Sequence, residues 1–129
     1  MILDSTFLVD FEREMRRKEH GPAGMFLQSN GDEVLCITFT IAGELAAGES
    51  LGGDREKWEA FLSPFRFLSY TPEVGWRFGI IYRRLRAAGM LIGANDLWIA
   101  ATALAYGQPL VTRNAADFKR IDGLEVHGY

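Results

Sequence analysis

Four acidic residues in this chain of 129 residues lie just after predicted strands or near the starts of predicted helices. Carboxylate oxygens are the ligands that hard divalent cations such as Mg²⁺ and Mn²⁺ prefer. A cation held by several acids lowers the pKa of a bound water and stabilises negative charge on phosphoryl oxygens. If the fold brings the four side chains together, they predict a metal site suited to phosphodiester hydrolysis. These candidate ligands are Asp4, Glu44, Asp96 and Asp117.

Each acid taken alone also has a simpler interpretation. Asp4 is placed to cap the helix that follows it, and Asp96 to favour a helix start through the helix dipole. Asp117 is placed to form an Asx turn, and Glu44 could be solvated on an outer helix face. The residues around Glu44 indicate instead that its helix is buried, because they are Ile41, Ala42 and Leu45.

The segment GANDLWIAATALAYG, residues 93–107, carries the strongest argument for a shared cation. From Leu97 to Tyr106 its only polar side chain, apart from the Tyr106 hydroxyl, is Thr102. A helix that is apolar on every face is buried, so we expect its first turn to lie inside the protein. An ionised carboxylate buried there without a partner costs several kcal/mol, and no Lys or Arg is near Asp96 in the sequence. A divalent cation shared with other acids would compensate this charge.

The elements that must position these acids alternate between short apolar runs and helix-like stretches. This order predicts a mainly parallel sheet with helices on both faces, a three-layer α/β/α sandwich. Ligands of such sheets bind beyond the carboxyl ends of the strands, where we expect all four acids. Strands are expected at residues 1–3, 33–39, 66–71 and 109–112, with a possible fifth at 124–128. Helices are expected at residues 4–21, 22–31, 41–52, 54–65, 73–89 and 93–107.

Capping residues and apolar spacing set the expected limits of the helices. Ser5 or Thr6 is predicted to cap the first helix, and Gly21 to end it. Thr38 or Thr40 is predicted to cap the helix at 41–52. The helix at 73–89 has an apolar stripe at helical spacing, formed by Val74, Phe78, Ile81 and Leu85.

Composition restricts the class of protein. The length suits one domain over residues 1–129. A net charge of −3 argues against a protein that coats nucleic acid non-specifically. If four acids bind a metal, however, the remaining residues have a net charge of +1, so this objection does not exclude a metal-dependent nuclease. A single cysteine, Cys36, indicates a buried thiol in a reducing cytoplasm. The start of the chain does not look like a signal peptide, and no apolar run is long enough to span a membrane.

With these residues in view, the whole chain resembles the PIN-domain family, and in size its VapC-type toxin ribonucleases. ILDSTFLVD resembles the opening strand and turn of the family, and CITFTIAGEL resembles the segment that carries the second acid. The stretch from Gly93 to Phe118 holds Asp96, Asn114 and Asp117 in the order and spacing of the family. One departure follows the first acid, where this chain has Ser-Thr-Phe and many members have Thr followed by Asn or Ser.

The resemblance implies a metal-dependent endoribonuclease of a toxin–antitoxin system, with one or two Mg²⁺ or Mn²⁺ ions. It also implies RNA as the substrate, products with a 5′-phosphate and a 3′-hydroxyl, a homodimer, and a small antitoxin that inhibits the enzyme. In this interpretation Asp4, Asp96 and Asp117 bind the metal directly or through water, and Glu44 completes the cluster. Ser5 and Asn114 are candidates for orienting the carboxylates. Thr112 and Arg113 are candidates for contacting the RNA backbone, although Arg113 could equally be solvated.

The sequence leaves two rival interpretations. A response-regulator receiver needs a pair of acids after its first strand and a Lys after its last, whereas this chain has Ser-Thr after Asp4 and Arg113-Asn114 at the late position. A non-catalytic PIN-like module would act only as a protein-interaction or scaffold domain. The presence of all four acids argues against it. The sequence also leaves two candidate surfaces for partners. One consists of apolar residues within 7–15 and 25–27. The other is the basic run at 16–18, although basic residues are also common at a solvated helix end.

Overall fold

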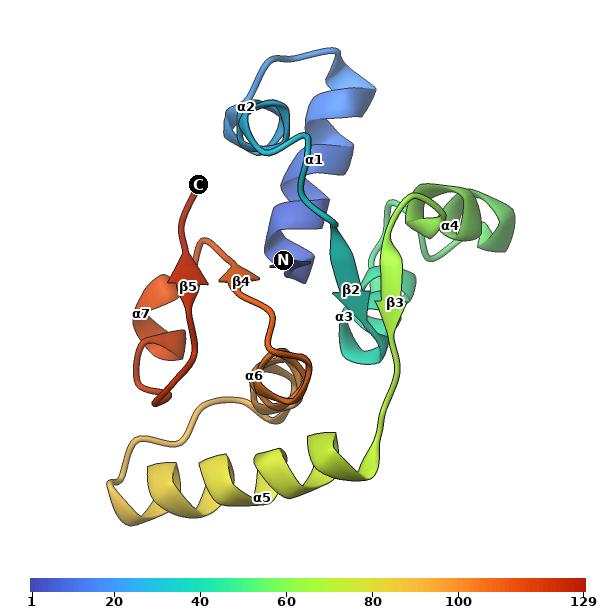
Figure 1. The fold of residues 1–129 in the computed structure, drawn as a ribbon. Coiled ribbons are helices and arrows are strands. Elements are labelled where there is room, and N and C mark those ends of the chain that lie inside the picture. Colours follow the sequence, from blue (N-terminus) through green and yellow to red (C-terminus); the bar gives the residue numbers. More distant parts are fainter.

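The computed structural model describes all 129 residues and contains a five-stranded sheet with the order β3-β2-β1-β4-β5 (Figure 1). Every pair of neighbouring strands is parallel. The strands are β1 (Ile2–Leu3), β2 (Cys36–Thr38), β3 (Arg66–Leu68), β4 (Leu110–Val111) and β5 (Val126–His127). The helices are α1 (Ser5–Arg17), α2 (Pro22–Ser29), α3 (Phe39–Ala47), α4 (Arg55–Leu62), α5 (Pro72–Ala87), α6 (Ala94–Tyr106) and α7 (Ala115–Phe118).

The helices form layers on the two faces of this sheet. The chain moves in one direction from β1 through β2 to β3 and then crosses back to β4 and β5. Because parallel crossovers are right-handed, the helices before and after this reversal lie on opposite faces. Figure 1 shows α1, α2 and α4 on one side of the strands, and α5, α6 and α7 on the other. The predicted three-layer α/β/α sandwich is therefore confirmed.

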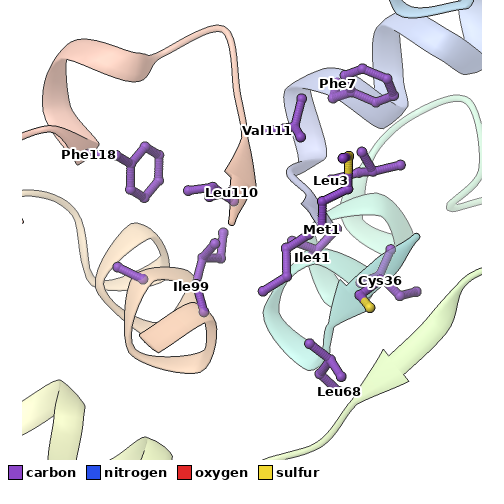
Figure 2. Packing of buried hydrophobic residues seen from close by; sticks show 14 of the residues in the cluster. Met1, Leu3, Phe7, Cys36, Ile41, Leu68, Ile99, Leu110, Val111 and Phe118 are labelled. Carbon is purple, nitrogen blue, oxygen red and sulfur yellow. The ribbon is translucent and has the colours of Figure 1, made fainter. Parts of the chain in front are cut away.

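The core explains why such short strands are stable. Ile2, Leu3, Leu110 and Val111 have no more than a trace of exposed surface because helices cover both faces of the sheet. Figure 2 shows buried side chains gathered around the strands, with Phe118, Leu110 and Ile99 in one group and Leu3, Ile41 and Cys36 in another. Cys36 is a buried free thiol, as predicted.

Helix α5 packs on α6 through the predicted apolar stripe. Val74, Ile81 and Leu85 are buried, and the ring of Phe78 stacks on that of Trp98 with centroids 4.0 Å apart. Neither of these helices, nor any other, is long and apolar enough to span a bilayer.

Two predicted helix limits are corrected. The N-cap of α1 is Asp4 rather than Ser5 or Thr6, since its Oδ1 accepts a hydrogen bond from the backbone N–H of Phe7 at 2.9 Å. Thr38 caps α3 by accepting from the N–H of Ile41 at 3.3 Å, which decides between the two predicted threonines. The strands are shorter than predicted, and α7 was not predicted because four residues are too few for a periodic pattern.

Gly21 does not end α1, which stops at Arg17 and is closed by Lys18 in the left-handed conformation. The glycine has a different role. The carboxylate of Glu14 accepts hydrogen bonds from the N–H groups of Ala23 (3.1 Å) and Gly24 (2.8 Å) and so caps α2. A Cβ at Gly21 would collide with this carboxylate, so the close approach requires glycine.

Candidate metal centre

The candidate acids lie at the carboxyl edge of the sheet, around the point where the strand order reverses. Asp4 directly follows β1, and its backbone N–H donates to the carbonyl of Val111 at the end of β4, at 3.1 Å. Asp117 lies in α7, which follows β4. Because the helices after β1 and β4 cover opposite faces, a crevice opens between these strand ends, and ligands of α/β sheets bind in such a crevice. Glu44 reaches this edge from α3, and Asp96 from the first turn of α6.

The four carboxylates share one electrostatic environment. Partial burial raises the pKa of Asp96 above its usual range, and the charges of Asp4 and Asp117 raise it further. Partial burial also raises the pKa of Glu44; a hydrogen bond with Ser5 opposes this shift, and the charges of Asp96 and Asp4 add to it. The charges of Asp4 and Asp117 act on Asp96. Those of Asp4 and Asp96 act on Glu44, so the four predicted ligands, called the acid cluster below, lie within electrostatic reach of one another.

Local hydrogen bonds orient two of the four acids. Asp4 is buried and accepts from the hydroxyl of Thr6 through Oδ2 at 2.9 Å, so its capping role and its place in the cluster coexist. The amide of Asn114 donates to Oδ2 of Asp117 at 2.8 Å. The side chain of Ser5 lowers the pKa of Glu44, and the orienting roles of Ser5 and Asn114 stay predictions.

Glu44 carries the feature that most directly suits a cation. Its Oε1 is buried and has no hydrogen-bond partner. A buried acceptor without a partner is costly, and a hard cation is one way to satisfy it. As the side chains stand, no three acidic, His or Cys groups are close enough to hold one ion, so closure around a metal requires side-chain rotation. The donor set and the unpartnered oxygen fit Mg²⁺ or Mn²⁺.

Asp96 is less enclosed than the sequence predicted. Gly93, Ala94 and Asn95 are exposed and Asp96 is partly exposed, whereas the buried part of α6 begins at Leu97. The apolar helix is therefore covered only beyond its first turn. This opening leaves the carboxylate of Asp96 accessible to an ion and to a substrate.

The two predicted RNA contacts have other partners. Thr112 is fully buried, and its Oγ1 accepts from the backbone N–H of Asn114 at 3.0 Å, so in this conformation it cannot reach RNA. Arg113 forms an ion pair with the buried carboxylate of Asp10. That carboxylate also pairs with Arg13 and accepts from the hydroxyl of Tyr129 at 2.7 Å. Arg113 is therefore paired rather than simply solvated, but 60% of its side chain is exposed, and its contact with RNA stays a prediction.

Sequence reasoning missed the buried acids of α1. Asp10, Glu12 and Glu14 lie in a helix with many charged residues, and each is nearly covered. Their partners are an arginine after β4, a lysine of α4 and the first turn of α2. No local pattern indicates such partners, although the pair Gly21 and Gly24 marks the place where the Glu14 carboxylate approaches the backbone.

Comparison with known proteins decides the family, since the model of the PIN domain matches residues 1–124. The chain belongs to the PIN-domain family. This PIN domain is 30% identical to ribonuclease VapC1 of Methanocaldococcus jannaschii, over 98% of the chain and 86% of that relative. The predicted resemblance to VapC-type proteins is thus confirmed.

Solved structures agree with the fold of this PIN domain. The structure of VapBC2 from Rickettsia felis, bound to a DNA fragment from their promoter, superposes with a TM-score of 0.81 at 24% identity, covering 99% of this chain and 97% of that one. A toxin–antitoxin complex from Klebsiella pneumoniae gives a TM-score of 0.73 at 20% identity, covering 95% and 93%. At these identities the likeness concerns the fold.

Proposed function

We propose that this PIN domain is a metal-dependent endoribonuclease and the toxin of a toxin–antitoxin pair. The observation that carries the proposal is the cluster of four acids at the strand-order reversal, with a buried unpartnered oxygen on Glu44. The ribonuclease name of the relative supports RNA as the substrate. A module that only binds proteins would have no use for neighbouring carboxylates that raise the pKa values of Asp96 and Glu44 and so cost stability at neutral pH.

Asp4, Glu44, Asp96 and Asp117 would hold Mg²⁺, with Mn²⁺ as an alternative. When bound, the cation supplies a water of lowered pKa and countercharge for the phosphoryl oxygens. Ser5, which acts on Glu44, would help to orient that carboxylate, and the amide of Asn114 fixes one oxygen of Asp117. The capping hydrogen bonds hold Asp4 at the end of β1. Water would attack phosphorus in line with the 3′-oxygen; the P–O3′ bond would break, and the proton that the water loses would be balanced by protonation of the 3′-oxygen to a hydroxyl.

This chemistry predicts the ends of the products. Attack by water leaves a 5′-phosphate and a 3′-hydroxyl, whereas attack by the 2′-hydroxyl of RNA leaves a cyclic phosphate and a 5′-hydroxyl. We expect fragments made with Mg²⁺ to be ligated to an adaptor that requires a 5′-phosphate, without prior treatment by a kinase. Fragments that become ligatable only after 5′-phosphorylation would contradict the proposed hydrolysis. Absence of any cleavage would favour the non-catalytic module.

We also propose where the antitoxin binds. A pocket of about 330 Å³ between α1 and α3 is lined by Glu44 itself, and an adjoining one of about 440 Å³ continues between α1 and α4. Glu12 and Leu51 line both, so the two form one groove that ends at the acid cluster. Its apolar wall includes exposed Val9 and Met15. The occupant we infer is an antitoxin segment with apolar side chains along the groove and an arginine beside Glu44, since a guanidinium can replace a cation among carboxylates.

A charged residue in this groove should free the enzyme from its inhibitor. Met15 is 57% exposed, and Met15→Glu should weaken antitoxin binding at least about tenfold because it buries a charge against apolar surface. RNA cleavage by the variant alone should be unchanged, since Met15 lies outside the acid cluster. Met25→Glu is the matched control, because Met25 is 60% exposed on α2 and lines none of the pockets described. Equal antitoxin affinity of the two variants, measured by titration calorimetry, would place the antitoxin elsewhere.

A further inference from the structure

The acid cluster alone would repel RNA, so a substrate needs a cationic surface nearby. Helix α5 is the element that concentrates positive charge. It carries four arginines and one glutamate, a net charge of +3, although the whole chain has a net charge of −3. The arginines of α5 are Arg77, Arg83, Arg84 and Arg86.

Two of these arginines meet a third at a small cavity. Arg77 and Arg84 of α5 line a space of about 60 Å³ together with Arg120, which follows α7. Ile81 and Leu85, which are buried, form part of its apolar lining. Asp122 also lines the cavity, which leaves three guanidinium groups against one carboxylate.

This arginine cavity adjoins the candidate metal centre. Nη2 of Arg120 lies 3.5 Å from Oδ1 of Asp117, one of the four clustered acids. Figure 1 shows α5 passing beneath α6 toward the side of the sheet that holds α7. Leu104 also lines the cavity and lies eight residues after Asp96 on α6, which is about 12 Å along the helix. A strand of RNA whose phosphate is cut at the acids would therefore pass this cavity further along its backbone.

The charges of the three arginines are not equally satisfied. Arg77 pairs with Glu73 at 2.8 Å, and Arg120 pairs with Asp117. Arg84 lies at the same cavity and has no ion pair within 4 Å. The side chains of Arg77 and Arg120 are 45% and 41% exposed, against 84% for Arg55 on α4, so the cavity partly holds these two in place, whereas Arg84 is exposed. Partly held guanidinium groups suit the planar, bidentate recognition of phosphate.

We propose that the cavity formed by Arg77, Arg84 and Arg120 binds a backbone phosphate of the RNA further along the strand from the one that is cut, with Arg84 as its principal contact. The inference rests on the proposed ribonuclease function and specifies how that enzyme holds its substrate. The contact is to phosphate and therefore independent of the base sequence. Its loss should weaken binding without changing the chemistry at the acids.

The test compares Arg84→Gln with Arg55→Gln, which makes the same change of charge on α4 at the opposite edge of the sheet. Both are made in an Asp96→Asn background that leaves RNA intact. The probe is a fluorescein-labelled single-stranded RNA of about 16 nucleotides with randomised sequence. Its Kd for the protein is measured at several salt concentrations. Arg84→Gln should raise Kd about fivefold, the upper range for one exposed ion pair. It should also reduce the slope of log K against log salt by about 0.7, and Arg55→Gln should do neither.

A second measurement separates binding from structure. With Asp96 intact, Arg84→Gln should raise KM for RNA cleavage by a similar factor and leave kcat within about twofold, and Arg84→Lys should restore the salt slope. If Arg84→Gln and Arg55→Gln have equal effects in a protein that does cleave RNA, the phosphate site at the arginine cavity is refuted and the proposed ribonuclease function is not. A protein that neither cleaves nor binds RNA in any arm would overturn the proposed function, and this inference with it.

Discussion

Asp96→Asn will reduce RNA cleavage by at least about a hundredfold, and EDTA will do the same to the unmodified protein. Changes to residues that only orient metal ligands typically cost about 10- to 100-fold, so loss of a proposed ligand should cost no less. The choice of Asp96 rests on its raised pKa, which burial and the charges of Asp4 and Asp117 produce. The measurement is the initial rate of cleavage of labelled RNA with Mg²⁺ in excess.

Asp32→Asn serves as the matched control, since Asp32 is exposed in the loop after α2 and makes the same change of charge. Its rate should equal that of the unmodified protein. Circular dichroism of both variants should match that of the parent, which excludes loss of the fold as the cause. Cleavage that persists in EDTA would refute the metal mechanism, and an active Asp96→Asn protein would remove Asp96 from the site.

The same substitution should stabilise the protein when no divalent ion is present. Two unit charges about 5 Å apart repel by about 3 kcal/mol at an effective dielectric constant of 20. Partial solvent exposure and movement of the side chains reduce the net effect, so we expect Asp96→Asn to gain about 1 kcal/mol in EDTA at neutral pH. If Asp96 served only the helix dipole, Asn would instead be mildly destabilising.

The pH dependence follows from the direction of the two pKa shifts. Asp96 and Glu44 have pKa values above their ordinary 3.8 and 4.5 in the folded protein, so above about pH 4 the folded state binds more protons than the unfolded state. Their contribution to the free energy of unfolding therefore falls as pH rises through these ordinary values to the raised ones. Urea denaturation in EDTA from about pH 4 to pH 8 should show a steeper fall for the unmodified protein than for Asp96→Asn.

Mg²⁺ should reverse this order of stability. At about a hundredfold excess over its Kd, a ligand that binds only the folded state stabilises it by about 2.7 kcal/mol. The unmodified protein should approach this gain in thermal or urea denaturation, and Asp96→Asn should gain much less. Equal gains in the two proteins would mean that Asp96 does not bind the ion.

Patterns between near neighbours were enough to predict the architecture. The alternation of apolar runs and helices predicted the parallel three-layer sandwich, and the spacing of Val74, Phe78, Ile81 and Leu85 predicted the buried face of α5. Thr38 was one of two predicted caps for α3. These features depend on residues within a few positions of each other, because helical periodicity and capping act over one or two turns. The motifs around the four acids are also short patterns of residues close together in the sequence.

Contacts between distant parts of the chain were decided only by the tertiary structure. Asp10 joins Arg113 and Tyr129, and Glu14 caps a helix nine residues further along. Arg84 of α5 and Arg120, which follows α7, line one cavity. None of these follows from local spacing, because the partner of a buried charge depends on which strands are adjacent and on which face each helix lies. The sequence therefore predicts which acids belong to the site. The order of the strands determines that these acids lie at one edge of the sheet, and it determines which other charges surround them.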